Sequence, residues 1–342
     1  MTHRFPIKEI ALQAGLSTAT IDRALNGRKH VSPQTAAQVA RAIAELEGQE
    51  TQLSARGRRM FFDFVIEAPM RFSREVKQAA EHVAPQMAGA NCRLRFVIQE
   101  MMSEGEVVGA LARVSKRGSQ GLCLKARDTP LIRESVNALM RAGIPVVTLV
   151  TDIQSSERLA YVGLDNASAG RTAAYLIATA IGEKDGSILT VRSNEDFRGE
   201  EQREKAFAQE LNRRSPRLKL HELSGGSGVH YETSKLMRQS EDALHNVVGV
   251  YSMGGGNRAI LAMLADHRLK SAIYIAHDLD RSNRALLAQQ SIDYVLHHDL
   301  RVDMNNVLLT FLHYHRLVSD PPFKPISDVQ VVTPMNIPPV FR

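Results

Sequence analysis

Apolar residues recur at helical spacing in three short segments near the start of the chain. The first segment, residues 7–14, places its isoleucines and alanines on one face. Gly15 tolerates a positive φ and so allows a sharp turn, and Ser17 is a preferred N-cap for a second short helix over residues 18–25. A third helix is predicted over residues 34–46, after a Ser-Pro start signal. This order predicts a helix-turn-helix, although an ordinary pair of packed helices has the same pattern.

From residue 61 onward, short apolar runs alternate with amphipathic stretches. Such runs predict strands, and strands that alternate with helices predict parallel sheets with right-handed crossovers. The predicted strands are 61–66, 92–98, 121–126 and 145–150, then, after residues 161–166, a second series at 187–192, 217–223, 247–252, 271–277 and 293–299. The predicted helices are 73–87, 103–115, 130–142, 168–181, 199–212, 230–244, 257–267 and 302–318. Two such series predict an α/β protein with two doubly wound sheets.

The length of 342 residues exceeds what one compact core usually holds, which predicts two or three domains. Hydrophobic residues make up 44% of the chain, and no apolar run approaches the roughly 18 residues of a membrane span. The first ten residues contain no apolar signal segment, and both cysteines lie in apolar runs. We therefore expect a cytoplasmic protein with reduced thiols.

Positive charge is concentrated at the amino-terminal end. The net charge is +6, and residues 1–60 hold nine lysines and arginines against five acids. This concentration is expected of a protein that binds a phosphate backbone, although a solvated surface has the same composition. Residues 48–59 lack apolar periodicity and are predicted to be a linker that is flexible without DNA.

Residues 4–47 resemble a known family. They contain the string I-x-x-I-A-x-x-A-G-L-S-x-A-T-I-x-R-A-L-N-G, followed by V-S-P-x-T and A-x-A-E-L. This string is similar to the DNA-binding domain of the lactose-repressor family of bacterial transcription regulators, and the rest of the chain resembles the two-lobed, periplasmic-binding-protein-like core of that family. The resemblance implies a helix-turn-helix domain (1–47), a hinge linker (48–60), an effector-binding and dimerisation core (61–320) and a carboxyl-terminal segment (321–342).

The resemblance also implies which side chains contact DNA. Residues that would face base edges are Thr18, Ala19 and Arg23, and Arg23 is a candidate bidentate partner of guanine. Residues that would hold phosphates are Ser17, Thr20 and Asn26. Asp22 departs from the family pattern, because an acid that faces DNA is repelled; it would accept from a cytosine amino group or orient a neighbouring arginine.

The linker departs from the family as well. In relatives this segment forms a short helix on DNA and inserts a leucine into the minor groove, but Gly57 occupies the leucine position here. Leu53 would replace that leucine, or Arg56, Arg58 and Arg59 would instead bind phosphates or a narrowed minor groove.

In this family the effector binds in the cleft between the sheets, at the carboxyl ends of the strands. Arg203 begins R-x-x-A-F, similar to the family's R-x-x-G-F, and we expect it to be only partly buried in an open cleft. Asp278 matches the aspartate of a G-[YF]-D motif, and Phe72 would either stack on a sugar ring or pack in the core. The implied effector contacts are Phe72, Asp152, Arg203, Asn257, Asp278 and His298.

Two loops allow other interpretations. His297, His298 and Asp299, with Asp303 nearby, suggest a metal site, but neighbouring histidines on a strand point to opposite faces, so we expect no metal. The Gly-rich loop 253–258 is a generic anion site at a helix start and lacks the nucleotide-binding motifs. The sequence contains no G-x-S-x-G, H-E-x-x-H or C-x-x-C, so we expect no cofactor and no catalysis.

We therefore expect a DNA-binding transcription regulator, a repressor that acts as a homodimer. Its partners would be double-stranded operator DNA and a small effector (a sugar, polyol or sugar acid, although a purine fits the same fold), and no membrane. Two alternatives are a transport-type solute-binding protein and an enzyme on a doubly wound fold. The lack of a signal segment and the basic amino-terminal domain argue against the first, and the lack of a catalytic motif argues against the second.

Overall fold

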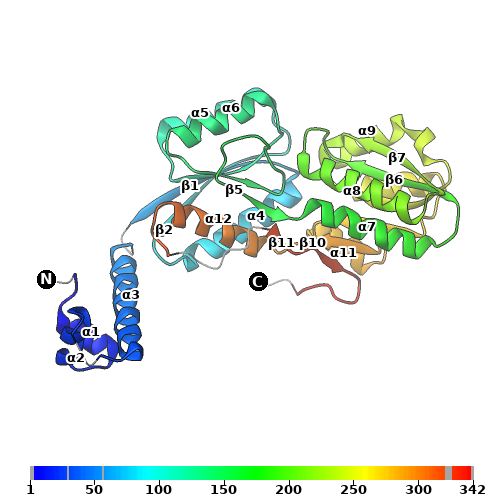
Figure 1. Cartoon of the computed structure of the whole chain (residues 1–342). Helices are drawn as coiled ribbons and strands as arrows, with labels where there is room; N and C mark the ends of the chain where they lie inside the picture. The colour runs from blue at the N-terminus through cyan, green and yellow to red at the C-terminus, as the bar shows by residue number, and fades with distance from the viewer. Residues whose placement is uncertain (1–3, 29–30, 56–57, 320–325, 340–342) are drawn as a thin grey trace.

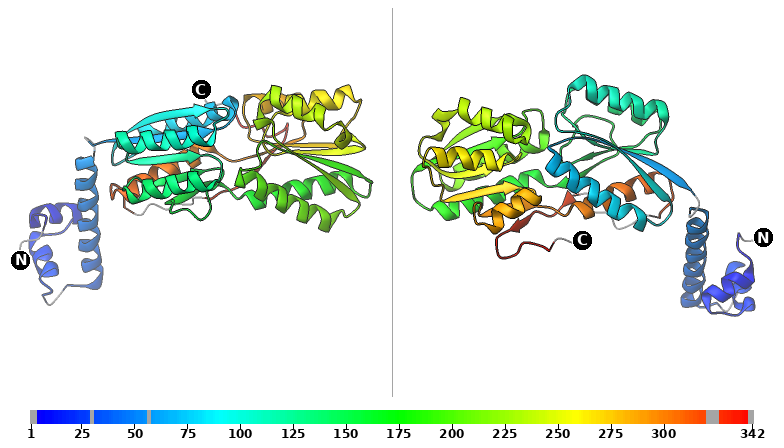
Figure 2. Two further views of the ribbon diagram at one scale, coloured as in Figure 1. Left: turned by 90° about the horizontal axis from the view of Figure 1, so that it is seen from above. Right: turned by 180° about the vertical axis from the view of Figure 1, so that it is seen from behind.

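The computed structural model describes residues 4–28, 31–55, 58–319 and 326–339. Figure 1 shows a small helical domain at the amino terminus, a long helix that leads away from it, and two α/β lobes. Lobe 1 comprises residues 59–164, 300–319 and 326–327, and lobe 2 comprises residues 166–297 and 330–332. Both views in Figure 2 place lobe 1 between the amino-terminal domain and lobe 2. The predicted fold class is confirmed.

The amino-terminal domain contains the two predicted short helices, α1 (Ile7–Ala14) and α2 (Thr18–Leu25). Gly15 ends α1 in the left-handed conformation, at a φ of 62°. Ile10 and Ile21 are fully buried in a small core with side chains of the third helix. Burial of each such side chain contributes about 1.5–3 kcal/mol, which fixes the angle between the two helices.

The third helix, α3 (Pro33–Ala55), is longer than predicted. It does not end at residue 46 but includes residues 48–55, which the sequence pattern assigned to a flexible linker. The reason is local: this stretch contains one glutamate, two glutamines, a leucine and an alanine, which favour helix, and its one glycine costs only about 1 kcal/mol. The division into DNA-binding domain, hinge and core remains a proposal.

Lobe 1 is built on a parallel sheet in the order β11-β5-β4-β3-β1-β2. Its strands are β1 (Arg59–Glu67), β2 (Asn91–Gln99), β3 (Gly121–Lys125), β4 (Val146–Leu149), β5 (Ala160–Leu164) and β11 (Ile326–Ser327). Its helices are α4 (Met70–Val83), α5 (Glu104–Arg117), α6 (Pro130–Arg141) and α12 (Leu300–Tyr314), with the short helix η1 (Ala84–Gln86). Helices α4 and α12 cover one face of the sheet, and α5 and α6 cover the other.

Lobe 2 repeats this plan in the order β12-β10-β9-β8-β6-β7. Its strands are β6 (Gly186–Arg192), β7 (Leu218–Ser224), β8 (Val247–Ser252), β9 (Ile273–His277), β10 (Tyr294–His297) and the antiparallel β12 (Gln330–Val332). Its helices are α7 (Asn166–Ile181), α8 (Arg198–Arg214), α9 (His230–Gln239), α10 (Asn257–Asp266) and α11 (Arg281–Ala288), with η2 (Gly226–Gly228) and η3 (Glu241–Leu244).

The chain crosses between the lobes at three places: after β5, after β10 and between β11 and β12. The sequence pattern predicted more than one crossing but not the third, because β11 and β12 are too short to show a period. It also missed α11, and it merged α9 with η3 into one helix. None of the described helices has the length and apolar character needed to cross a lipid bilayer.

Gly170 lies where α7 and α8 approach each other closely. A Cβ at this position would collide with the carbonyl oxygen of Arg203. We expect Gly170→Ala to lower the free energy of unfolding by about 1–3 kcal/mol, since the two helix backbones must separate. Gly105→Ala is the matched control, because no atom lies within 4 Å of a Cβ there. Gly105→Ala should leave the free energy of unfolding unchanged or raise it by about 0.4–1 kcal/mol. Urea unfolding measures both, and equal stabilities would mean that α7 and α8 can separate without cost.

Candidate functional site

Helix α2 presents the predicted DNA contacts on the outside of the amino-terminal domain. The side chain of Ser17 caps α2 by accepting from the amide of Thr20 at 3.2 Å. Thr18, Ala19 and Arg23 are exposed, whereas Ile21 on the opposite face is buried. The Arg23 guanidinium is held by a single intrahelical bond, from Nε to the carbonyl oxygen of Ala19 at 3.1 Å. Arg23 is exposed, and no other described residue engages its guanidinium, so the remaining donors are available to a partner.

Asp22, the acid that departs from the family pattern, is paired within the domain. Its Oδ2 lies 3.2 Å from the guanidinium of Arg28, and its Oδ1 accepts from Asn26 at 2.8 Å. Because a cation and an amide already occupy this carboxylate, its negative charge is partly neutralised beside the DNA-facing surface. The same contact engages Asn26, which was expected to hold a phosphate.

Part of the hinge can be located. Arg58 and Arg59 are exposed at the start of β1. Arg56 lies outside the described residues, as does the side chain of Leu53. The choice between an apolar wedge and an electrostatic hinge therefore stays a prediction.

The cleft between the lobes contains a small polar cavity at the carboxyl ends of the strands. Its volume is about 30 Å³, room for roughly two water molecules. Lobe 1 lines it with Ala68, Pro69, Arg71, Phe72, Lys125, Val150 and Thr151. Lobe 2 lines it with Ser193, Phe197, Gly199, Glu200, Arg203, Met253, Gly254 and Asp278. The position agrees with the general rule for ligand sites in open α/β sheets.

Two buried cations in this cavity are held by neutral acceptors. Arg203 Nε donates to Asn166 Oδ1 at 2.7 Å, and its Nη1 donates to the carbonyl oxygen of Met253 at 3.1 Å. Lys125 Nζ donates to the carbonyl oxygen of Glu67 at 3.0 Å. Burial lowers the pKa of the Lys125 ammonium, although nearby carboxylates oppose this effect.

Aromatic and hydroxyl groups complete the wall. Lys125 Nζ lies 3.9 Å from the ring centroid of Phe197, a cation–π contact. Glu200 accepts from both the amide of Ser193, at 2.6 Å, and its hydroxyl, at 2.5 Å. The cavity thus combines two aromatic rings, those of Phe72 and Phe197, with fixed donors and acceptors.

One carboxylate oxygen of Asp278, Oδ1, accepts no hydrogen bond from the described residues. This Oδ1 is buried, and its nearest charged neighbour is His298 Nε2 at 3.7 Å. His298 Nδ1 in turn lies 2.5 Å from Asp303 Oδ2. Burial, the largest single influence, lowers the pKa of His298, but the charge and hydrogen bond of Asp303 together with the charge of Asp278 raise it above its usual value. His298 therefore stands behind Asp278 and supports it, and does not itself line the cavity.

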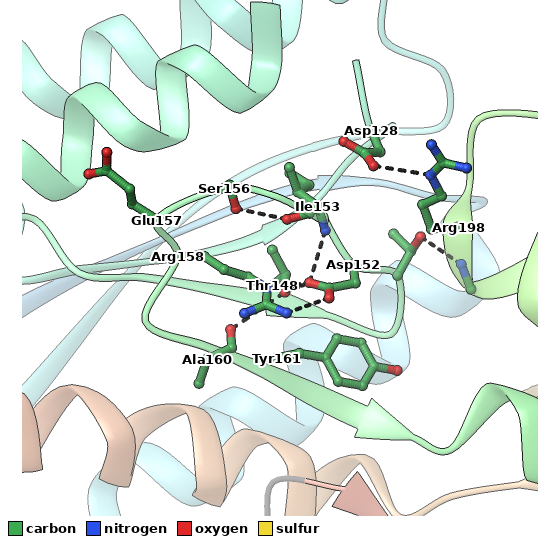
Figure 3. A network of polar contacts seen from close by, with 12 residues as sticks. Asp128, Thr148, Asp152, Ile153, Ser156, Glu157, Arg158, Ala160, Tyr161 and Arg198 are labelled. Carbon is green, nitrogen blue, oxygen red and sulfur yellow. Dashed lines mark hydrogen bonds and ion pairs between the residues drawn. The ribbon is translucent and has the colours of Figure 1, made fainter. Parts of the chain in front are cut away.

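Ion pairs from opposite lobes hold the cleft closed. Arg71 of lobe 1 forms an ion pair with Asp280 of lobe 2 and donates to the carbonyl oxygen of Gly254 at 3.2 Å. A Cβ at Gly255 would overlap the Arg71 guanidinium, so the Gly-rich loop makes room for it. At the other end, Arg198 of lobe 2 pairs with Asp128 of lobe 1 at 3.1 Å, as Figure 3 shows.

Besides His298, two predicted effector contacts do not line this cavity. Asp152 is bound by Arg158 in a two-pronged ion pair and accepts from Thr148 at 2.7 Å (Figure 3). Asn257 is turned into lobe 2, where it donates to Asn283 at 2.6 Å and accepts from Tyr274 at 3.0 Å. In both cases a nearer partner within the same lobe uses the polar group.

The remaining predicted contacts are brought together: Phe72, Arg203 and Asp278 line the cavity, and His298 lies behind Asp278. Arg203 is only 2% exposed in this closed form, so its partial burial in an open cleft stays a prediction. Among the charged and aromatic residues of the wall, the sequence pattern missed four: Arg71, Lys125, Phe197 and Glu200. The signal for Lys125 was available, because a lysine that ends an apolar strand lies at the carboxyl edge of a parallel sheet.

Sugar-binding proteins are among the solved structures with this fold. The core is similar to GanP, a glucose-galactose binding protein from Geobacillus stearothermophilus, with 17% identity, a TM-score of 0.70, and coverage of 82% of this chain and 99% of that one. A solute-binding protein from Burkholderia graminis C4D1M in complex with D-arabinose matches at 17% identity and a TM-score of 0.71, over 82% of this chain and 96% of that one.

A candidate LacI transcriptional regulator from Bacteroides fragilis matches at 15% identity and a TM-score of 0.69, over 82% of this chain and 98% of that one. At such identities the likeness shows the fold alone. No curated protein matches the chain.

Family models identify both parts of the chain. Residues 71–301 match the periplasmic binding protein domain. Residues 6–47 match the bacterial regulatory proteins of the lacI family. The chain therefore belongs to the periplasmic binding protein domain family over most of its length and carries a DNA-binding domain of the lacI family of bacterial regulatory proteins at its amino-terminal end.

Proposed function

We propose that this ligand-regulated transcription regulator is a homodimeric, cytoplasmic repressor, and that a sugar, polyol or sugar acid in the cleft controls its affinity for operator DNA. One observation carries the proposal. A lacI-type DNA-binding domain is joined to two lobes whose strand ends converge on Phe72, Arg203 and Asp278. The matched domains are those of regulators and binding proteins, which favours binding over catalysis.

The wall of the cavity supports a polyhydroxylated effector. Charged side chains bind hydroxyl groups in fixed directions, and the rings of Phe72 and Phe197 suit the apolar face of a sugar ring. The buried oxygen of Asp278 is an acceptor that a ligand hydroxyl would satisfy. The sugar-binding proteins that share the fold support the same class of ligand.

The size of the cavity implies that binding is linked to lobe movement. A volume of about 30 Å³ excludes a sugar ring, since ligand pockets usually span about 300–1,000 Å³. An effector must therefore separate the lobes and replace contacts such as Arg71–Asp280. The resulting rotation changes the spacing of the two DNA-binding domains in a dimer, with a coupling free energy of about 1–3 kcal/mol.

The recognition role of α2 is tested by Arg23→Ala. We expect a loss of about 1–3 kcal/mol in operator binding and relaxed specificity at one base pair per half-site, because Arg23 offers free guanidinium donors. Arg41→Ala, an exposed arginine of α3, is the charge control and should lower binding uniformly at most. Fluorescence anisotropy on operator and random DNA measures both. An equal loss for Arg23→Ala on the two DNAs would reduce this arginine to a phosphate contact.

The hinge is tested by replacing Arg56, Arg58 and Arg59 with glutamine. If these arginines bind phosphates, the slope of log affinity against log salt should flatten by roughly 0.9 for each phosphate that the variant no longer binds. Leu53→Ala is the comparison and should have a small effect. The opposite pattern, an unchanged slope with a large effect of Leu53→Ala, would show that an apolar wedge operates in a shifted register.

Sensing is tested by Arg203→Ala. The variant should lose the effector response and keep the operator affinity measured without effector, because Arg203 lies in the cleft, outside the DNA-binding domain. Two buried acceptors lose their donor, so we also expect a stability loss of about 1–3 kcal/mol. A thermal-shift screen of sugars, polyols and sugar acids first identifies the effector, since a ligand at 100 times its Kd stabilises by about 2.7 kcal/mol.

Arg258→Ala is the control for this experiment. Arg258 is an exposed arginine of lobe 2 that donates to Ser282 at 3.1 Å and does not line the cavity. It should retain the full effector response. A normal response by Arg203→Ala would remove Arg203 from the site, and a folded variant that no longer binds DNA would contradict the separation of sensing from DNA binding.

A further inference from the structure

A second basic surface lies on the core, at the end of the lobe 1 sheet where β1 begins. Four segments meet there: residues 58–63, 91–95, 116–121 and 313–318. Together they carry seven lysines and arginines and one acid. The cations, which we call the basic end of lobe 1, are Arg58, Arg59, Arg93, Arg95, Lys116, Arg117 and Arg316.

Hydrogen bonds join these segments into one surface. The amide of Asn91 donates to the carbonyl oxygen of Arg58 at 2.9 Å, and the amide of Gln120 donates to that of Phe61 at 2.9 Å. His315 Nε2 lies 2.6 Å from the carbonyl oxygen of Gln120. The basic end therefore has a fixed shape, built from the starts of two strands, the end of α5 and the end of α12.

The single acid does not reach the surface. The side chain of Asp63 is 1% exposed and is bound by both Arg95, at 2.6 Å, and Arg117. One carboxylate thus neutralises only one of two guanidinium groups, and the excess charge stays positive.

The other five cations are exposed, and no ion pair engages them within the described part of the chain. They are Arg58, Arg59, Arg93, Lys116 and Arg316. Nine of the 43 basic residues and five of the 37 acids lie in residues 1–60, so residues 61–342 have a net charge of only +2. The basic end is therefore a local concentration of charge and does not reflect a uniformly basic core.

The basic end faces the amino-terminal domain. Helix α3 leads into β1 at this end of lobe 1, and lobe 2 lies on the far side (Figures 1 and 2). DNA held by α2 would therefore pass closer to the basic end than to any part of lobe 2. Duplex DNA carries one negative charge per roughly 1.7 Å of its axis, so cations at its flank gain binding energy from any sequence.

We propose that the basic end of lobe 1 binds the phosphate backbone of the same DNA duplex that the amino-terminal domain reads, which makes the core a second, sequence-independent DNA contact. This inference rests on the proposed function. The contact adds affinity and not specificity, because exposed lysines and arginines on separate segments carry no arrangement for base edges.

The test uses the full-length chain with three core cations replaced: Arg93→Gln, Lys116→Gln and Arg316→Gln. The control replaces three exposed cations of lobe 2 instead: Lys219→Gln, Lys235→Gln and Arg238→Gln. Both variants lose the same charge, so they differ only in position. Binding to operator and to random duplex is measured by fluorescence anisotropy across a salt series, and circular dichroism confirms the fold.

We expect the lobe 1 variant to flatten the salt slope by roughly 0.9 for each phosphate that it no longer binds, equally on both DNAs. The lobe 2 control should retain the wild-type slope. Arg93→Lys with Arg316→Lys should retain it too, because a phosphate contact needs only the charge.

Three results would overturn the inference: a wild-type slope in the lobe 1 variant, an equal change in the lobe 2 control, or a loss confined to operator DNA. If the wild-type protein binds no DNA, the proposed function fails first. If the wild-type protein binds DNA and the lobe 1 variant has the same salt slope as wild type, only the proposed contact by the core is refuted.

Discussion

Two carboxylates buried where the lobes meet, Asp280 and Asp128, each bind an arginine of the opposite lobe. A buried carboxylate that loses its cation costs several kcal/mol, so these pairs resist opening of the cleft. The two are not equivalent. Asp128 retains Arg133 of its own lobe at 2.8 Å when the lobes part, whereas Asp280 retains, among the described residues, only the amide of Asn283. Separation of Arg71 from Asp280 is therefore the costlier step, and the state of the cleft depends most on what replaces Arg71.

The Arg71–Asp280 pair explains why the loop after β8 is rich in glycine. As sequence, residues 253–258 suggested an anion site at a helix start. In the structure a guanidinium from the other lobe lies against the loop, where a Cβ at Gly255 would overlap it and one at Gly254 would collide with Ser193. The glycines thus permit a contact between lobes, and an effector that enters must compete with Arg71 for the same space.

The sequence predicted the fold well where each element carries its own signal. Apolar periodicity placed α1, α2, the strands β1 to β4 and the strands β6 to β10 to within a few residues, but it did not predict β5. It failed where the outcome depends on distant partners. Asp152 follows its strand as a cleft residue should, yet Arg158 takes its carboxylate. Lys125 ends an apolar strand, which places it at the carboxyl edge of the sheet, but its contact with Phe197 of lobe 2 exists only in the assembled lobes. Spacing identifies which loops reach the cleft, but the pairing of their charges is a property of the assembled lobes.

One strand connects the cleft to the DNA-binding domain. At its start, β1 follows α3 after only three intervening residues, which span at most roughly 15 Å. At its other end, β1 leads into α4, whose first turn carries Arg71, the lobe 1 partner of Asp280. β1 is hydrogen-bonded to β2 and β3 on its two sides, so it moves with the whole lobe 1 sheet. Loss of the Arg71–Asp280 pair therefore leaves the lobe 1 sheet free to move relative to lobe 2, and β1 of this sheet follows α3 in the chain. Because α3 is unbroken from Pro33 to Ala55, a length of about 35 Å, we expect a rotation of lobe 1 that reaches α3 to move α2 as well.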